Sequence, residues 1–205
     1  MMNVFIINGG HAFAHSPGGF NKTLLERTQS FFEAQKGYQV KTTQIGSDFD
    51  LTEEVEKYKW ADLIIYHTPI WWFQVPFKFK EYIDKVFTAG HNTGIYTSDG
   101  RSRTNPAINY GTGGSLHGKK YMVTSSWNAP KEAFTLAGEF FDQKSVDEGV
   151  LFGFHKMNQF IGLDLLGSTH FHDMEKNADV ERELAKYDNF LNEIFKNKNS
   201  QALAS

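Results

Sequence analysis

The sequence predicts an α/β fold in which a parallel sheet of five strands lies between two layers of helices. Short apolar runs typical of buried strands alternate along the chain with segments of helical periodicity, and such alternation produces parallel sheets with right-handed crossovers. The chain of 205 residues is long enough for one such domain and contains no internal repeat. We assign residues 1–198 to this domain and expect residues 199–205 to form a disordered tail.

The strands at residues 3–8 and 62–68 are predicted from runs that stay apolar nearly throughout, the pattern of strands buried on both faces. The run at residues 38–45 is more polar, and Val40 is its residue expected to face inward. The first run ends at Gly9 and Gly10, and the third is followed by a proline. The predicted strands are residues 3–8, 38–45, 62–68, 121–125 and 163–172.

The helices are predicted from apolar residues spaced three, four or seven apart, which places them on one helix face. Leu24 and Phe31 show this spacing in the first helix, which begins near Asn21. The later predicted helices are residues 51–59, 79–87, 150–161 and 180–194. Five parallel strands connected in this way, with the first at the start of the chain, favour the flavodoxin-like strand order 2-1-3-4-5.

A long segment, residues 88–118, interrupts the alternation with many glycines and no predicted helix or strand. Loops of this length are usually functional or disordered. The aromatic residues Tyr96 and Tyr110 favour an ordered loop that helps to build a site. Contact with a second subunit is the alternative source of order.

The composition excludes several classes of function. The chain has 21 basic and 24 acidic residues without a block of like charges, so its charge pattern does not indicate a surface that binds nucleic acid or anionic lipid. It has no cysteine, which excludes disulfides, thiolate metal sites and iron–sulfur clusters. His170 and His172 share a strand face but lack a third ligand, so no metal site is predicted. Without a signal peptide or an apolar stretch of spanning length, the protein is expected to be cytoplasmic.

The predicted ligand site lies at the carboxyl ends of the strands, where the winding of an open parallel sheet reverses. The loop after the first strand carries Ser16, Gly18 and Gly19 and opens onto a helix, so its backbone amides can cradle a phosphate. An ordinary loop with Ser16 or Asn21 as a helix cap is the alternative. The loop is not a G-x-G-x-x-G motif and lacks the lysine of a P-loop, which disfavours an NTPase.

The loops after the third and fourth strands bring large rings to the same edge. Trp71, Trp72 and Phe73 are consecutive in a turn between two prolines and cannot all face one core, so some must face a ligand or a partner subunit. A planar heterocycle such as an isoalloxazine fits stacking rings beside polar backbone groups. Trp127 follows the fourth strand in a polar turn. A dimer interface is the alternative use of these rings, and both uses are compatible.

Four motifs, in this order along the chain, resemble the flavodoxin-like NAD(P)H:quinone reductases, and within them the group of the bacterial modulator of drug activity B. They are His15-Ser16 with Phe20-Asn21, Pro69-Ile70-Trp71-Trp72, Tyr110-Gly111-Thr112-Gly113-Gly114 and Trp127-Asn128-Ala129-Pro130. The resemblance covers almost the whole chain. It implies a homodimer with FAD at its interface, NADPH or NADH as the hydride donor, and quinones or similar small electrophiles as acceptors.

The resemblance also implies which residues hold the cofactor. They are His15, Ser16, Pro17, Gly18, Gly19, Phe20, Asn21, Lys22 and Thr23, then Pro69, Ile70, Trp71 and Trp72, then Tyr110, and finally Ser126, Trp127, Asn128 and Ala129. Ile70 departs from the glycine expected at its position; its bulkier side chain is expected to narrow the pocket, and its backbone amide is expected to remain usable. Amides of the turns at Trp71-Trp72 and Trp127-Asn128 are expected to stabilise charge on the reduced ring.

Tyr110 is the predicted catalytic residue, donating a hydrogen bond to the quinone oxygen. We rank it above His155, because a histidine inside a helix is more often a packing or surface residue. Arg101 and Arg103 either attract the additional phosphate of NADPH or lie in an exposed loop.

Two rival functions remain: an FMN-dependent azo or nitro reductase, and a flavodoxin-type electron carrier. Such carriers are usually strongly acidic, whereas the net charge here is −3.

Overall fold

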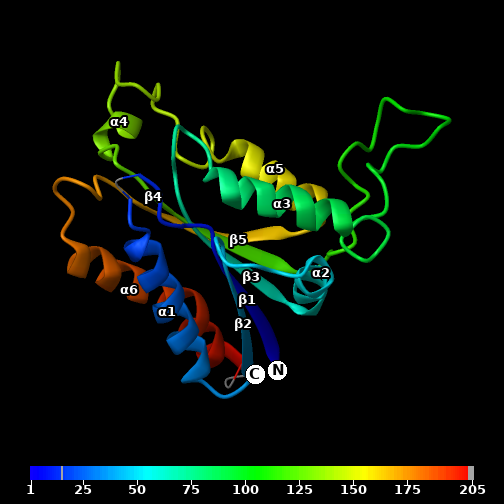
Figure 1. Cartoon of the computed structure of the whole chain (residues 1–205), viewed down its shortest axis with the longest axis horizontal. Coiled ribbons are helices and arrows are strands. Elements are labelled where there is room, and N and C mark those ends of the chain that lie inside the picture. The colour runs from blue at the N-terminus through cyan, green and yellow to red at the C-terminus, as the bar shows by residue number, and fades with distance from the viewer. Residues whose placement is uncertain (15, 203–205) are drawn as a thin grey trace.

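The computed structural model describes residues 1–14 and 16–202, and its five parallel strands form one sheet in the order β2-β1-β3-β4-β5 (Figure 1). The strands are β1 (Met2–Asn8), β2 (Tyr38–Gln44), β3 (Leu63–Pro69), β4 (Lys120–Ser126) and β5 (Asp164–Phe171). All four pairings between neighbouring strands are parallel. The predicted sheet and its flavodoxin-like order are therefore confirmed.

Helices cover both faces of the sheet (Figure 1). The helices are α1 (Gly19–Glu33), α2 (Leu51–Trp60), α3 (Phe77–Ala89), α4 (Glu132–Thr135), α5 (Phe152–Phe160) and α6 (Val180–Ala202). Strand side chains alternate between two cores, with Val4 and Ile6 packed among residues of α1 and α6, and Phe5 and Ile7 among residues of α2, α3 and α5. Because both faces are covered, the central strands are apolar throughout.

Two details differ from the predicted boundaries. The four-residue helix α4 follows Trp127 and was not predicted; it is too short to show helical periodicity. Helix α6 continues to Ala202, inside the segment 199–205 that was expected to be disordered, and residues 203–205 lie outside the described residues. None of the helices in the described part of the chain is long and apolar enough to cross a membrane.

The segment between α3 and β4, which we call the arm (residues 90–118), contains no helix or regular strand, as predicted. It packs closely where it lacks side chains: a Cβ added at Gly114 would collide with the Ile161 backbone, and one at Gly113 with the Ser98 carbonyl. The arm enters β4 at its amino end. It therefore lies at the edge of the sheet opposite to the carboxyl ends of the strands (Figure 1).

Candidate functional site

The loop after β1 passes directly into α1 through a left-handed glycine. Gly18 has a φ of 76°, and a Cβ there would lie 3.2 Å from the carbonyl carbon of His11. No side chain among the described residues caps α1, and its first turn has no acidic residue. The N–H groups of Gly19, Phe20 and Asn21 therefore remain available to an anion. The alternative in which Ser16 or Asn21 caps the helix does not occur in the described residues.

Asn21 is held inside the site with half of its amide unpaired. Its side chain is 3% exposed, and Nδ2 donates to Ser126 Oγ over 3.0 Å. Oδ1 is buried without a hydrogen-bond partner among the described residues. A buried acceptor left unpaired costs about 1–3 kcal/mol. Asn21 Oδ1 is therefore placed to accept a hydrogen bond from a ligand.

The turn after β3 is a two-residue hairpin turn closed by Trp71 and Gln74. Trp71 N donates to Gln74 O over 2.9 Å, and Gln74 N donates to Trp71 O over 3.0 Å. Between them Trp72 and Phe73 both have positive φ, 47° and 62°. Trp72 is 92% exposed and Phe73 45% exposed. As predicted from the sequence, the three aromatic residues do not share one core, and the turn holds two of them outward in a strained backbone conformation.

The turn after β4 fixes Trp127 against the sheet. Its backbone N donates to Phe171 O over 2.8 Å, and its indole Nε1 donates to Ser125 Oγ over 2.7 Å. The rings of Phe134 and Phe141 stack at 3.9 Å, and each meets the indole edge-on. The side chain of Trp127 is 4% exposed. It forms a rigid aromatic wall at the carboxyl edge.

Two adjoining cavities occupy this edge. The first has a volume of 280 Å³ and is lined by Ser16, Pro17, Gly18, Gly19, Phe20, Asn21, Pro69, Ile70, Trp71, Ser126, Trp127, Asn128, Met174 and Glu175. The second has a volume of 620 Å³ and is lined by Ile70, Trp72, Phe73, Trp127, Asn128, Ala129, Pro130, Asp173, Lys176 and Asn177. Ile70, Trp127 and Asn128 line both, so the cavities meet there. The three predicted loops are thus brought together in space.

Some residues implied by the resemblance lie elsewhere. Lys22 points outward and pairs with Glu26, while Thr23 Oγ1 donates to Gly19 O over 3.2 Å. His15 lies outside the described residues. Tyr110 is 70% exposed on the arm, 5.9 Å from the ring of Phe160, and lines neither cavity. A single chain therefore does not combine Tyr110 with the cavities.

The arm also holds Arg101, which the sequence offered as a partner for the additional phosphate of NADPH. Its guanidinium donates to Asp99 Oδ2 from Nε over 2.9 Å and from Nη2 over 2.7 Å, and it lies over the ring of Tyr110. The hydrogen bonds from Arg101 lower the pKa of Asp99. Arg101 is therefore already paired with an anion of its own chain.

The backbone amides require a correction to the sequence-based expectation. Ile70 N donates to Ser126 O over 3.0 Å, so this amide is not available to a ligand. The amides of Trp71 and Trp127 are also used within the protein. In these turns the N–H groups of Trp72 and Asn128 donate to no other group of the described residues. Of the two amides expected in each turn, the first is thus paired within the protein and the second, at Trp72 and at Asn128, is available.

Sequence reasoning missed the contribution of the segment after β5. Met174 and Glu175 line the first cavity, and Asp173, Lys176 and Asn177 line the second. The position of the fifth strand was a usable signal, because its carboxyl end lies at the same edge as the others. No motif marks these residues, so composition alone did not reveal them.

Comparison with known proteins decides the family. A family model described as a flavodoxin-like fold matches residues 2–193. The NADPH:quinone oxidoreductase MdaB of Haemophilus influenzae is 45% identical over 195 residues, which cover 95% of this chain and 100% of that protein. The chain belongs to the flavodoxin-like quinone reductase family. The family predicted from the four motifs is therefore confirmed.

Solved structures of other proteins have the same fold as this member of the quinone reductase family. A candidate quinone reductase from Klebsiella pneumoniae superimposes with a TM-score of 0.73 at 21% identity, covering 95% of this chain and 85% of that one. General stress protein 14 of Treponema denticola, solved in complex with FMN, gives a TM-score of 0.61 at 20% identity, covering 95% and 99%. At these identities the likeness concerns the fold alone.

Proposed function

We propose that this protein is an FAD-dependent NAD(P)H:quinone oxidoreductase that transfers a hydride from NADPH, or NADH, to quinones or similar small electrophiles in a two-step exchange. The observation that carries the proposal is the edge where the free amides of α1, the unpaired Asn21 Oδ1 and the aromatic walls line one site. The activity named for the Haemophilus relative supports the same reaction. We expect it to act in the cytoplasm and without nucleic acid.

The residues of this site fit a flavin nucleotide. The N–H groups of Gly19, Phe20 and Asn21, at the positive end of the α1 dipole, would hold the phosphates. Trp71 and Trp127 line the first cavity and would bound a planar ring. The second cavity extends the site beyond the first, which favours FAD over the shorter FMN.

The chemistry of the hydride would belong to the cofactor: a bound flavin would supply, at N5, the acceptor for the nicotinamide hydride and its donor to the quinone. The protein's own groups orient the reactants and stabilise charge. The amides of Trp72 and Asn128 donate to no other group of the described residues and would bind a negatively charged ring edge. The stacked rings of Phe134 and Phe141 keep water from the outer side of Trp127.

We also infer a homodimer with the site at its interface. Phe13, Trp72, Phe77 and Phe140 each expose more than half of their surface, and Trp72 lines the second cavity itself. Exposed aromatic patches of this kind mark interaction surfaces. Tyr110 lies at the opposite edge of its own sheet, so a role at the quinone requires Tyr110 of the partner subunit.

An FMN-dependent azo or nitro reductase with the same fold is the second candidate. Its support is the FMN found in the Treponema protein and a first cavity that by itself accommodates only part of a dinucleotide. An electron carrier of the flavodoxin type is disfavoured by the near-neutral charge of −3.

The absorbance spectrum of the purified protein, followed by chromatography of the released flavin, tests the proposal. We expect bound FAD that is bleached by NADPH without oxygen and recoloured by menadione. Bound FMN would favour the azo or nitro reductase. A protein that binds no flavin even after reconstitution would refute the enzyme proposal.

A further inference from the structure

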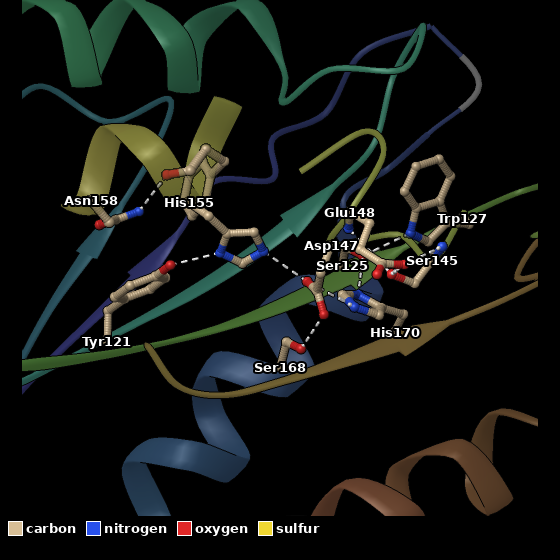
Figure 2. Close-up of polar contacts among 11 residues, drawn as sticks. Tyr121, Ser125, Trp127, Ser145, Asp147, Glu148, His155, Asn158, Ser168 and His170 are labelled. Atoms are coloured by element: carbon tan, nitrogen blue, oxygen red, sulfur yellow. Dashed lines mark hydrogen bonds and ion pairs between the residues drawn. The ribbon is translucent and has the colours of Figure 1, made fainter. Parts of the chain in front are cut away.

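Beside the candidate site, one carboxylate collects polar contacts from β5 and α5 (Figure 2). Ser168 Oγ donates to Asp147 Oδ2 over 2.6 Å, and His155 Nε2 lies 2.8 Å from Oδ1. His170 Nε2 makes no aligned hydrogen bond but lies 3.3 Å from Oδ1. Burial raises the pKa of Asp147, but the hydrogen bonds from His155 and Ser168, together with the nearby His170 ring, outweigh this effect and hold the pKa well below its usual range. Asp147 is therefore an anion.

A chain of short contacts joins this anion to Trp127. His170 Nδ1 lies 2.7 Å from Ser125 Oγ, and Trp127 Nε1 donates to the same oxygen over 2.7 Å. Ser125 is fully buried. Figure 2 shows His170 between Asp147 and Ser125, with the indole beyond. The path from Asp147 to the cavity wall therefore consists of two intervening side chains.

The chemistry of the donors gives the chain a direction. An indole N–H can only donate, so Ser125 Oγ accepts from Trp127. The Ser125 hydroxyl hydrogen has one acceptor within the described residues, His170 Nδ1. That nitrogen must then be unprotonated, which puts the ring hydrogen on Nε2, facing Asp147. A carboxylate stabilises this tautomer of histidine.

A second branch of the network runs from Asp147 toward α5 through another histidine. Tyr121 OH lies 2.6 Å from His155 Nδ1, and the opposite ring nitrogen of His155 faces Asp147. Burial, followed by the charge of Asp147, raises the pKa of Tyr121, so its hydroxyl remains a donor. This branch leads away from Trp127, so a variant that breaks it can be compared with one that breaks the branch to Trp127.

The order Ser125, His170, Asp147 also resembles a hydrolase triad, but the structure excludes that use. Ser125 is fully buried, and its oxygen is occupied by the indole of Trp127. A substrate carbonyl has no access to it. The constellation acts on a neighbouring side chain instead.

We propose that Asp147 is a positioning residue that orients the indole of Trp127, the aromatic residue that lines both cavities, through His170 and Ser125. The carboxylate fixes the tautomer of His170, the tautomer fixes the direction of the Ser125 hydroxyl, and the freed lone pair of Ser125 holds the indole. The consequence for flavin binding rests on the proposed function, whereas the coupling of Asp147 to Trp127 does not.

The test follows the indole N–H resonances of the purified full-length protein, labelled with nitrogen-15. The chain has four tryptophans, and Trp127→Phe identifies the resonance of Trp127. Asp147→Asn is expected to shift that resonance, and Ser125→Ala to shift it as well. In the Ser125→Ala background, Asp147→Asn should cause no further shift. An unmoved resonance in Asp147→Asn, or an additional shift in the double variant, would overturn the proposal.

Two control variants separate positioning from general loosening. Glu148→Gln changes an adjacent exposed carboxylate that bonds only Ser145 in the described residues, and should leave the resonance in place. Tyr121→Phe breaks the other branch of the network, and it should lower Tm without shifting the Trp127 resonance. A shift equal to that of Asp147→Asn would contradict the proposal. Asp147→Asn should also weaken flavin binding about tenfold, unlike Tyr121→Phe. If the resonances behave as expected but the wild-type protein binds no flavin, only the proposed function fails.

Discussion

Asn21 Nδ2 donates to Ser126 Oγ over 3.0 Å, which joins the first turn of α1 to the last residue of β4. The two residues are far apart in the sequence, and both line the first cavity. The bond holds the free amides of α1 beside the aromatic walls. It also turns the unpaired Oδ1 of Asn21 into a fixed acceptor.

Replacing Asn21 should therefore impair flavin binding more than stability. Asn21→Ala removes the hydrogen bond proposed between Oδ1 and the flavin, and should raise the flavin dissociation constant about tenfold. Asn21→Asp should have a larger effect, because it places a negative charge beside the phosphates. Fluorescence titration of the apoprotein measures both. Gln29→Ala, which alters an exposed pair on the same helix, is the matched control; equal affinities in all variants would contradict the assignment.

The strained turn at Trp72 should lower the stability of the monomer and strengthen the dimer. Trp72 has a φ of 47° and almost no burial in the single chain. Trp72→Gly relieves the left-handed conformation and should stabilise the monomer by about 1 kcal/mol in urea unfolding. Trp72→Phe keeps the strain and should not. Because Trp72 lies on the proposed interface, sedimentation should show a weaker dimer for Trp72→Gly; an unchanged dimer would remove Trp72 from the interface.

Stability should fall in mild acid because of one buried histidine. His67 is fully buried between Thr28 and Thr124, and burial lowers its pKa to about 3. The unfolded state binds a proton below its ordinary pKa of about 6.5 while the folded state does not, so the stability present above that value decreases on acidification.

For His67 alone, the loss between pH 7.5 and pH 5 should be about 2 kcal/mol. Urea unfolding at the two pH values measures it. His67→Gln removes the titrating group while it keeps polar contacts, so its loss over the same interval should be smaller by that amount. Parallel pH profiles for the two proteins would rule out His67 as the source.

Tyr110 should act across the subunit interface. Tyr110→Phe is expected to raise the Michaelis constant for the quinone, since it removes the hydroxyl donor. Mixing subunits tests the location: a Tyr110→Ala protein and an Asn21→Asp protein, each with reduced quinone reductase activity, should recover part of that activity when they are refolded together. In a mixed dimer one site then has an intact cavity and an intact tyrosine. No recovery in confirmed mixed dimers would place Tyr110 outside the shared site.

The sequence by itself determined the sheet and the general place of the site. Apolar runs such as residues 3–8 must be covered on both faces, and the crossover helices follow from the alternation of elements. The carboxyl ends of these strands then meet at one edge. The three loops that line the cavities were identified for this reason, because local chemistry and topology agree there.

Only the tertiary structure decided which groups at this edge are free. Ile70 and Ser126 are distant in the sequence, yet their backbone bond removes the Ile70 amide from the site. The arm connects to the amino end of β4, and this separates Tyr110 from the cavities of its own chain. The contacts of Asp147 with His155, Ser168 and His170 likewise form only where β4, β5 and α5 come together in the fold. Hydrogen bonds depend on distances of about 3 Å between residues that no local pattern relates, so periodicity predicts the scaffold but not the pairing of its polar groups.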